Sequence, residues 1–367
     1  MISFFVGTAA ELVKLAPVIR EVKRRGGAFN VVSSGQNDLR GSELWDLAEV
    51  PGPDLTLSTR PIPPRATGLA SFLARTTASG VGELRRALAG HPRDTIKAVV
   101  HGDTVSTLMG ASLYAALGIA VHHVEAGLRS FLLGEPFPEE ICRVLVSRIA
   151  RVAYCPNPWA AGHLDGLKIR KVLTGGNTLY DALELALPRG TEASPSLLPP
   201  VLADLDAPYF VLVVHRQENL LGPSFLRRIL ERVRAVPGRP KCVFLMHALT
   251  RTALADAGLL ADLERDPSFV LLPRQPYVAF MHVVARAEYL VTDGGSNQEE
   301  AYYLGKPCLL MRRVTERIEG LGENVKLSRD PVHEIEGFMR DPSRWARERV
   351  VLPESPSGII AKDLLAP

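Results

Sequence analysis

The 367-residue sequence contains only four cysteines, and no two of them stand at the spacing of a zinc ribbon or a redox dithiol. Their surroundings are mostly apolar, so we expect reduced core cysteines at Cys142, Cys155, Cys242 and Cys308. No apolar stretch approaches the roughly 18 residues that a membrane helix requires. The sequence therefore predicts neither a metal site nor a membrane partner.

Neither sign of charge dominates, because 43 basic and 40 acidic residues leave a net charge of +3. A dedicated nucleic-acid binder normally carries a basic stripe, so nucleic acid is not an expected partner. A small anionic ligand stays possible, since one phosphate pocket requires only a few local donors. The N-terminal apolar run has no basic region before it, so we expect a strand rather than a secretory leader, and the cytoplasm as the compartment.

What the sequence does contain is an alternation of apolar strands and amphipathic helices. An apolar run over Ile2–Val6 precedes a helix predicted over 9–25, in which Pro17 is expected to cause a kink or an interruption. Lys14 in this helix is, by itself, best interpreted as a solvated helix lysine. The alternation continues along the chain, which is typical of an α/β fold with parallel sheets.

Two proline-rich stretches interrupt the alternation. The stretch from Pro51 to Pro64 is expected to form an irregular surface loop. The alternation restarts after the second stretch, so a domain boundary is predicted there. The predicted organisation is an N-terminal Rossmann-like domain at 1–187, a linker at 188–208, a C-terminal Rossmann-like nucleotide-binding domain at 209–340, and a tail at 341–367 that packs back on the first domain.

Two predicted strands of the first domain end in acidic residues, at the sheet edge where open α/β folds bind ligands. Asp103 follows an apolar run at 98–100, and Glu125 follows one at 119–124. Acids in such places are costly to bury unless they are paired or functional. With Glu139 they form a candidate carboxylate cluster, and crowded carboxylates push their pKa values apart, which suits general acid–base catalysis.

Two polar segments of the second domain are candidates for phosphate contacts. A lone histidine such as His215 at a strand end is usually structural, but Arg216 and Glu218 beside it favour an acid–base or phosphate role. The glycines of Asp293–Ser296 precede a helix, where they form either a phosphate cradle or a tight turn with positive φ. Glu300 could accept hydrogen bonds from ribose hydroxyls or stabilise the helix dipole.

Taken in order, these motifs resemble the non-hydrolysing UDP-N-acetylglucosamine 2-epimerases, from residue 7 to about 327. The motifs that carry the resemblance are His101–Thr104, His123–Arg129, Pro136–Glu140, Thr174–Thr178 with Asp181 and Ala182, His215–Asn219, Gln298–Ala301 with Gly305–Pro307, and Thr315–Arg317. So many motifs in family order are far more specific than any single glycine pattern.

The resemblance implies a fold of the glycosyltransferase-B type, with two Rossmann-like domains facing across a cleft, a homodimer, and no metal or nicotinamide cofactor. It implies inversion at C2 of a UDP-sugar, UDP-N-acetylglucosamine to UDP-N-acetylmannosamine, by elimination and re-addition of UDP. Carried over by motif, Asp103, Glu125 and Glu139 are the acid–base residues, and His215 neutralises the leaving diphosphate. The predicted substrate-binding residues are Lys14, Arg129, Gly294, Gly295, Ser296, Glu300 and Arg317.

The sequence departs from the family pattern on the nucleotide side. The family's Gly-Thr-Arg-Pro-Glu turn is Gly7–Glu11 here, with Ala9 in place of the arginine that normally reaches the nucleotide phosphates. Loss of such a charge-assisted contact costs on the order of 1.5–3 kcal/mol unless another donor replaces it. Two alternatives stay open: a hydrolysing 2-epimerase or UDP-sugar glycosyltransferase, which would release free UDP steadily, and a nucleotide-binding homologue without turnover.

A second departure concerns regulation. The segment Ser34–Asn37 stands where the family has Thr-Gly-Gln-His, and the resemblance links that region to a second, regulatory UDP-sugar site in bacterial enzymes. We predict that this site is absent or altered, so progress curves should rise without a lag phase. A lag that added UDP-N-acetylglucosamine abolishes would contradict this prediction.

Overall fold

The computed structural model describes residues 1–57, 66–132, 137–190, 194–203, 205, 207–220 and 223–367. Parts of three predicted segments lie outside these residues: 58–64 of the proline-rich loop, Pro136 of a family motif, and 191–193, 204 and 206 of the linker. The described chain divides into two compact units, which we call unit 1 (Met1–Leu185 with Leu352–Pro367) and unit 2 (Ala186–Val351).

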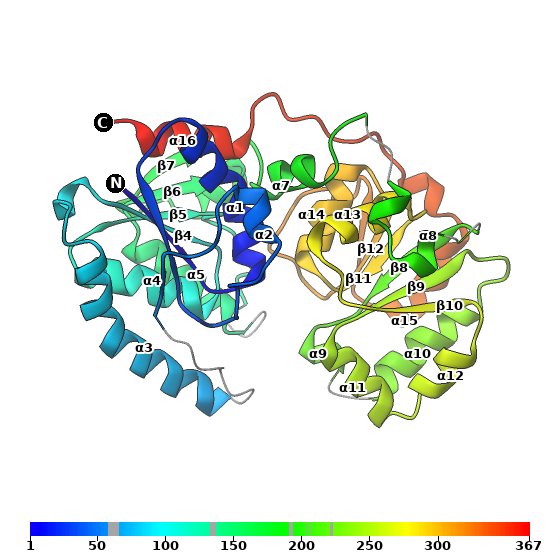
Figure 1. Ribbon diagram of the computed structural model, residues 1–367. Helices are drawn as coiled ribbons and strands as arrows, with labels where there is room; N and C mark the ends of the chain where they lie inside the picture. Colours follow the sequence, from blue (N-terminus) through cyan, green and yellow to red (C-terminus); the bar gives the residue numbers. More distant parts are fainter. Residues whose placement is uncertain (58–65, 133–136, 191–193, 204, 206, 221–222) are drawn as a thin grey trace. The chain divides into compact units, whose positions relative to one another are not determined.

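Unit 1 contains a seven-stranded parallel sheet in the order β3-β2-β1-β4-β5-β6-β7 (Figure 1). Its strands are β1 (Ile2–Val6), β2 (Phe29–Ser33), β3 (Leu55–Thr56), β4 (Lys97–His101), β5 (Ala120–Val124), β6 (Val152–Cys155) and β7 (Arg170–Leu173). Its helices are α1 (Ala9–Arg24), α2 (Leu44–Ala48), α3 (Ala66–Ala87), α4 (Val105–Ala116), α5 (Glu139–Ile149), α6 (Pro158–Gly162), α7 (Leu179–Ala186) and α16 (Pro356–Leu365), with a 3₁₀ turn at Arg93–Thr95.

Helix α1 forms because its sequence supplies both a start signal and an apolar face. The Thr8 side chain caps the helix by accepting a hydrogen bond from the Glu11 backbone N–H at 3.2 Å. The helix continues through Pro17, so the expected interruption is wrong. Buried apolar neighbours on both sides of the proline hold it in the helix: Leu12, Leu15, Val18, Ile19 and Val22.

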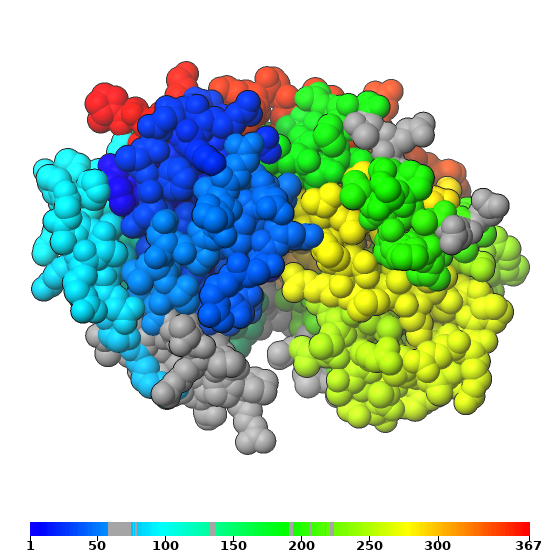
Figure 2. All heavy atoms as spheres, viewed as in Figure 1, coloured from blue at the N-terminus to red at the C-terminus, as the bar shows by residue number. Residues whose placement is uncertain are grey.

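The C-terminal segment Leu352–Pro367 belongs to unit 1. Helix α16 packs against α1, and the two segments lie side by side at the surface, the first in red and the second in dark blue (Figure 2). Two contacts fix this helix further. Asp363 accepts hydrogen bonds from the Tyr154 hydroxyl at 2.8 Å and from the Arg170 guanidinium at 2.7 Å. The end of the chain is therefore part of the structure around strands β6 and β7.

Unit 2 contains a six-stranded parallel sheet in the order β10-β9-β8-β11-β12-β13 (Figure 1). Its strands are β8 (Tyr209–Val213), β9 (Lys241–Met246), β10 (Phe269–Pro273), β11 (Leu290–Thr292), β12 (Cys308–Met311) and β13 (Val325–Ser328). Its helices are α8 (Pro200–Ala203), α9 (Gln217–Leu220), α10 (Pro223–Arg234), α11 (Ala248–Asp256), α12 (Leu260–Arg265), α13 (Tyr277–Arg286), α14 (Gly295–Leu304) and α15 (Pro331–Arg340), with 3₁₀ turns at Pro195–Leu197 and Pro342–Trp345.

Both sheets reverse their strand order next to the first strand of the unit, between β1 and β4 and between β8 and β11. This reversal is the feature of Rossmann-like sheets that opens a ligand site at the carboxyl ends of the strands. The predicted pair of Rossmann-like α/β sheets is therefore confirmed. The four cysteines are free and buried, as expected. None of the helices in the described part of the chain is long and apolar enough to cross a membrane.

Candidate functional site

Glu125 follows strand β5 in an unusual backbone conformation. Its φ is +61°, in the left-handed region that residues with a side chain rarely adopt. Strained residues of this kind concentrate at functional sites. Two residues later, Gly127 has a φ of +85°, and a Cβ there would lie 2.1 Å from the Ala160 carbonyl oxygen. The turn after β5 therefore combines a strained residue with a glycine whose backbone lies directly against α6.

One oxygen of Glu125 lies close to side chains from three separate elements. Glu125 Oε2 pairs with the Lys14 ammonium of α1, accepts a hydrogen bond from Asn177 Nδ2 at 2.7 Å, and lies 3.2 Å from His101 Nε2 at the end of β4. All four residues are buried, none of them more than 7% exposed. Lys14 is therefore not a solvated helix lysine, and its charge is paired with a carboxylate in a dry environment where the two stabilise each other.

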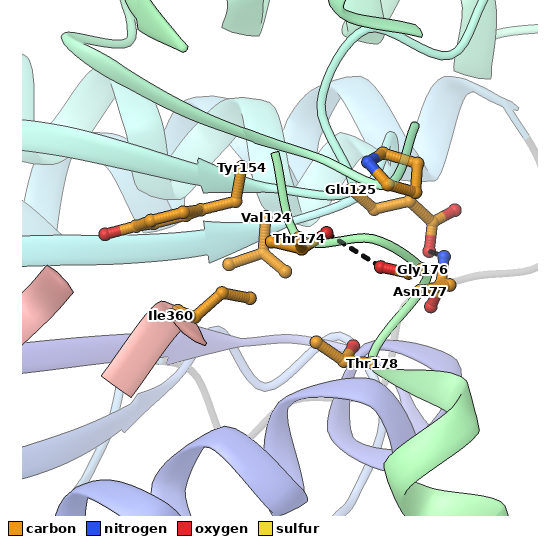
Figure 3. Close-up of a pocket in the computed structure, with 9 residues that line it drawn as sticks. Val124, Glu125, Tyr154, Thr174, Gly176, Asn177, Thr178 and Ile360 are labelled. Carbon is orange, nitrogen blue, oxygen red and sulfur yellow. Dashed lines mark hydrogen bonds between the residues drawn. The ribbon is translucent and has the colours of Figure 1, made fainter. Parts of the chain in front are cut away.

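The Glu125 carboxylate and Asn177 also line a small pocket at the carboxyl ends of β5 and β6 (Figure 3). Thr178 lies beside Asn177 on the segment that leads into α7, and Ile360 of α16 reaches the pocket from the opposite side (Figure 3). The turn below Glu125 is held by a hydrogen bond from the Thr174 hydroxyl to the Gly176 carbonyl at 2.7 Å. The C-terminal helix thus forms part of the wall around the predicted acid–base residue.

An ion pair ties Asp103 to α5, the helix that begins at Glu139. Arg143 of α5 pairs with Asp103, which follows β4, and it also bonds Glu140 at 3.2 Å. Burial raises the pKa of the Cys142 thiol to about 12, and the negative charges of both Asp103 and Glu139 add to that rise.

His123 lies on β5 two residues before Glu125, and its ring contacts the turn that leads to Asp103. Its ring is buried on β5 with Nε2 2.7 Å from the Gly102 carbonyl oxygen. Burial lowers its pKa to about 4, so the ring is neutral at pH 7, while the charges of Asp103 and Glu125 act in the opposite direction. The structure therefore places Asp103 and Glu125 after neighbouring strands, with Glu139 at the start of the helix that pairs with Asp103. Their individual roles stay predictions.

Arg129 is engaged within unit 1. Its Nε bonds Glu140 at 2.5 Å, and its guanidinium stands 4.9 Å from the centre of the Phe131 ring. Burial alone would raise the pKa of Glu140, but hydrogen bonds from Arg129 and from the Ser130 N–H lower it below its usual value. The arrangement shows Arg129 fixing the segment after β5, and its predicted contact with substrate stays a prediction.

In unit 2, a buried carboxylate holds the predicted histidine. Asp293 after β11 accepts hydrogen bonds from the backbone N–H groups of His215 and Arg216 and from Asn219 Nδ2, at 2.9–3.1 Å. His215 Nδ1 lies 3.0 Å from the same carboxylate, and the ring stacks on His247. A carboxylate beside Nδ1 favours one orientation of an imidazole ring.

The glycines at the start of α14 are required for space rather than for positive φ. Gly294 has a φ of −84°, and a Cβ there would lie 3.0 Å from His215 Cε1. A Cβ at Gly295 would lie 2.7 Å from Arg317 Nη1 and 3.2 Å from Arg312 Nη1. The tight-turn interpretation is therefore wrong. The helix N-terminus instead stands beside two guanidinium groups, an arrangement that favours an anion.

Two other predicted residues of unit 2, Glu300 and Ser296, lie on the same helix. Glu300 is buried and accepts a hydrogen bond from Asn297 Nδ2 at 2.8 Å, and Ser296 is half-buried in the first turn. Arg317 pairs with Glu316 and with Glu299 at 3.0 Å, so its position is fixed from within unit 2. The predicted substrate-binding residues of unit 2 thus gather around the start of α14.

Four neighbours of these residues were given no role by the sequence analysis: His101, Asn177, Asp293 and Arg312. The first three lie inside segments already noted, so the signal was their position at strand exits. Arg312 directly follows β12, it is 8% exposed, and its Nη1 has no hydrogen-bond partner among the described residues. No group of three His, Cys, Asp or Glu residues in the described chain could hold a metal ion.

The two segments that depart from the family pattern lie against each other. The Asn37 N–H donates a hydrogen bond to the Gly7 carbonyl oxygen at 2.8 Å. The Asn37 side-chain oxygen in turn accepts a hydrogen bond from the Ala9 N–H at 3.4 Å. The altered first turn and the altered Ser34–Asn37 segment are therefore one continuous region of unit 1.

Comparison with known proteins identifies the family. The statistical model of a family described as UDP-N-acetylglucosamine 2-epimerase matches residues 21–334. A UDP-N-acetylglucosamine 2-epimerase of Methanocaldococcus jannaschii is 29% identical over 334 residues, which cover 88% of this chain and 87% of that protein. A UDP-2,3-diacetamido-2,3-dideoxy-D-glucuronate 2-epimerase of Pseudomonas aeruginosa is 31% identical over 228 residues, which cover 61% of this chain and 60% of that protein.

A solved structure extends the similarity to the fold. The crystal structure of the M. jannaschii UDP-GlcNAc 2-epimerase in complex with UDP-GlcNAc and UDP is similar to this chain with a TM-score of 0.81. The sequence identity is 26%, and the alignment covers 99% of both chains.

Proposed function

Because the chain belongs to the UDP-N-acetylglucosamine 2-epimerase family, we propose that it inverts C2 of a UDP-sugar, converting UDP-N-acetylglucosamine to UDP-N-acetylmannosamine. The observation that carries this proposal is the set of carboxylates at the β4 and β5 exits, with Glu125 held by Lys14 and Asn177 beside the His101 ring. Two relatives that act on different sugars are both named 2-epimerases, which supports the position of the reaction more firmly than the identity of the sugar.

The proposed chemistry is an elimination followed by a re-addition. A carboxylate of unit 1 takes the proton from C2, the C–H electron pair forms a C1–C2 double bond, and UDP leaves with the electron pair of the C1–O bond. UDP then adds back to C1 while a second acid delivers a proton to the opposite face of C2. Asp103, Glu125 and Glu139 are our candidates for these steps, because a clustered set of carboxylates can hold different protonation states.

We assign to unit 2 the stabilisation of the negative charge on the departing UDP. The C2 proton is weakly acidic, so stabilisation of the leaving diphosphate must supply much of the driving force. His215, oriented by Asp293, and the N-terminus of α14 with Arg317 are suited to this task. Glu300 is our candidate for the ribose, and Lys14 and Arg129 complete the substrate-binding set.

Isotope exchange at C2 tests the proposal directly. The protein is incubated with UDP-N-acetylglucosamine in deuterated water, and C2 is followed by NMR. We expect deuterium at C2 together with inversion, because the second acid has exchanged with the solvent and delivers a deuteron to the opposite face of C2. The control is the same measurement with Asp103→Asn, in which exchange should be lost. Steady release of free UDP would instead favour a hydrolysing 2-epimerase or a glycosyltransferase.

For the assembly and the compartment we propose a homodimer in the cytoplasm. The family resemblance supports the homodimer, and light scattering of the purified protein measures it. Four free and buried cysteines are compatible with a reducing compartment.

A further inference from the structure

Glu11 is a buried carboxylate to which the proposed chemistry gives no task. It lies in the first turn of α1 and is 2% exposed. Its Oε2 accepts a hydrogen bond from the Gly7 N–H at 2.7 Å, and its Oε1 accepts one from the Thr104 hydroxyl at 2.5 Å. These donors belong to two different turns, the one between β1 and α1 and the one between β4 and α4. A single side chain therefore joins both turns.

Each of the joined elements carries a residue of the proposed active site. Thr104 is the N-cap of α4 and follows Asp103 directly. Lys14 stands one turn after Glu11 on α1 and pairs with Glu125. Through these contacts, the first turn of α1 reaches the carboxylate after β4 and the carboxylate after β5. A displacement of that turn would alter the distance between the two carboxylates.

The surroundings of Glu11 make this contact sensitive to protonation. Among the described residues no lysine, arginine or histidine pairs with its carboxylate, and the charged group that acts on it is Asp103, whose negative charge opposes ionisation. Burial, the largest cause, raises the pKa of Glu11 from 4.5 to about 7. Both oxygens accept hydrogen bonds, so the ionised form satisfies both donors, whereas a proton on Oε1 or Oε2 competes with one of them.

We propose that Glu11 is a positioning residue that holds the Asp103 turn against the helix carrying Lys14, so that the carboxylates after β4 and β5 keep a fixed separation. This inference rests on the proposed function for its consequence in catalysis. The contact of Glu11 with the two turns does not depend on the proposed function and can be measured without any substrate.

Hydrogen exchange of the free protein tests the contact. Glu11→Leu removes both acceptors, so we expect backbone amides at residues 102–107 to exchange roughly 10-fold faster or more, together with Gly7. The matched control is Glu21→Leu, at the other end of the same helix, where the carboxylate pairs with Arg25 at 3.2 Å. Faster exchange confined to α1 in the Glu11 variant would overturn the proposal, because the two turns would then be held by other contacts.

Kinetics with Glu11→Gln test the consequence. A misplaced acid–base pair lowers the rate of the chemical step more than it affects binding, so we expect kcat to fall about 10-fold with KM within about 2-fold of the wild type. The kcat of the wild type should rise with pH through about 7, and the variant should lack this step. An unchanged kcat with an unchanged pH profile would contradict the inference. If the wild type itself does not epimerise UDP-N-acetylglucosamine, the proposed function fails while the exchange experiment still decides the contact.

Stability supplies a further readout with a defined sign. Because the folded protein holds the Glu11 proton more tightly than the unfolded chain, this group contributes stability below pH 4.5 that is lost as the pH rises through about 7. Relative to Glu11→Gln, the wild type should therefore become less resistant to urea between pH 4.5 and 8. A difference that stays constant over this range would show that Glu11 does not titrate as a buried group.

Discussion

Glutamine in place of Glu125 is expected to lower kcat for C2 epimerisation by about 10²- to 10⁴-fold, the usual contribution of a positioned acid or base. The substitution preserves the shape of the side chain and leaves an oxygen for Asn177 and for Lys14, so binding of the UDP-sugar should change little. It removes the capacity to accept a proton at neutral pH. The measurement is the initial rate of UDP-N-acetylmannosamine formation at saturating substrate, together with deuterium incorporation at C2.

The chain offers a matched control for this variant in Glu49. It is also a glutamate with a left-handed backbone, at a φ of +57°, and it also pairs with a cation, Arg20, at 2.8 Å. Its side chain is 40% exposed, and it lies outside the candidate site. Glu49→Gln should leave kcat within about 2-fold of the wild type, since exposed ion pairs contribute little. If the Glu125 variant keeps more than a tenth of the wild-type rate, Glu125 is not an acid–base residue, and Asp103 and Glu139 are the remaining candidates.

The places where functional residues would lie could be predicted because a simple rule governs them. Side chains that follow the strands of a parallel sheet meet at one edge, and Asp103, Glu125, His215 and Asp293 all follow predicted strands. The rule says nothing of which neighbours surround each residue. That depends on packing between segments far apart in the sequence, as when Asn177 reaches Glu125 across 52 positions.

Lys14 shows how packing overrides a local interpretation. A lysine in an amphipathic helix is normally solvated, but α1 is buried on nearly every side from Glu11 to Ile19. The sequence did contain a signal, because Leu12, Val13, Leu15 and Ala16 surround the lysine with apolar residues on successive faces of the helix. A helix that is apolar all round is a buried helix, and a charge inside it requires a partner.

Edge strands were the part of the fold that the sequence predicted least well. Strands β3, β7 and β13 were not predicted, and each lies at the edge of its sheet. An edge strand is paired on one side only and carries fewer buried side chains, so its apolar pattern is weak. In β7, for example, Arg170 and Leu173 are both exposed. These strands form because the neighbouring strand offers unpaired backbone groups, which no local pattern records.

The largest expected effect on stability comes from Lys14→Met, which should destabilise unit 1 by about 3–5 kcal/mol at neutral pH. Methionine fills nearly the same volume and suits the apolar surroundings of α1, so the loss does not come from packing. It comes from removal of the cation that the structure places on Glu125, a residue only 7% exposed. Tryptophan fluorescence during urea unfolding measures the loss. In a Trp345→Phe background the remaining tryptophans, Trp45 and Trp159, both report on unit 1.

The double variant Lys14→Met/Glu125→Gln separates this explanation from a general defect in folding. If an uncompensated carboxylate causes the loss, neutralising it should restore most of the stability, and the double variant should be more stable than Lys14→Met alone. If the two losses add instead, each side chain contributes independently and the ion pair is not the cause. Both variants should be inactive, because one lacks the cation beside the acid–base residue and the other lacks the residue itself. Restored stability without restored activity would therefore show that the charge on Glu125, costly to bury, is retained for the reaction rather than for the fold.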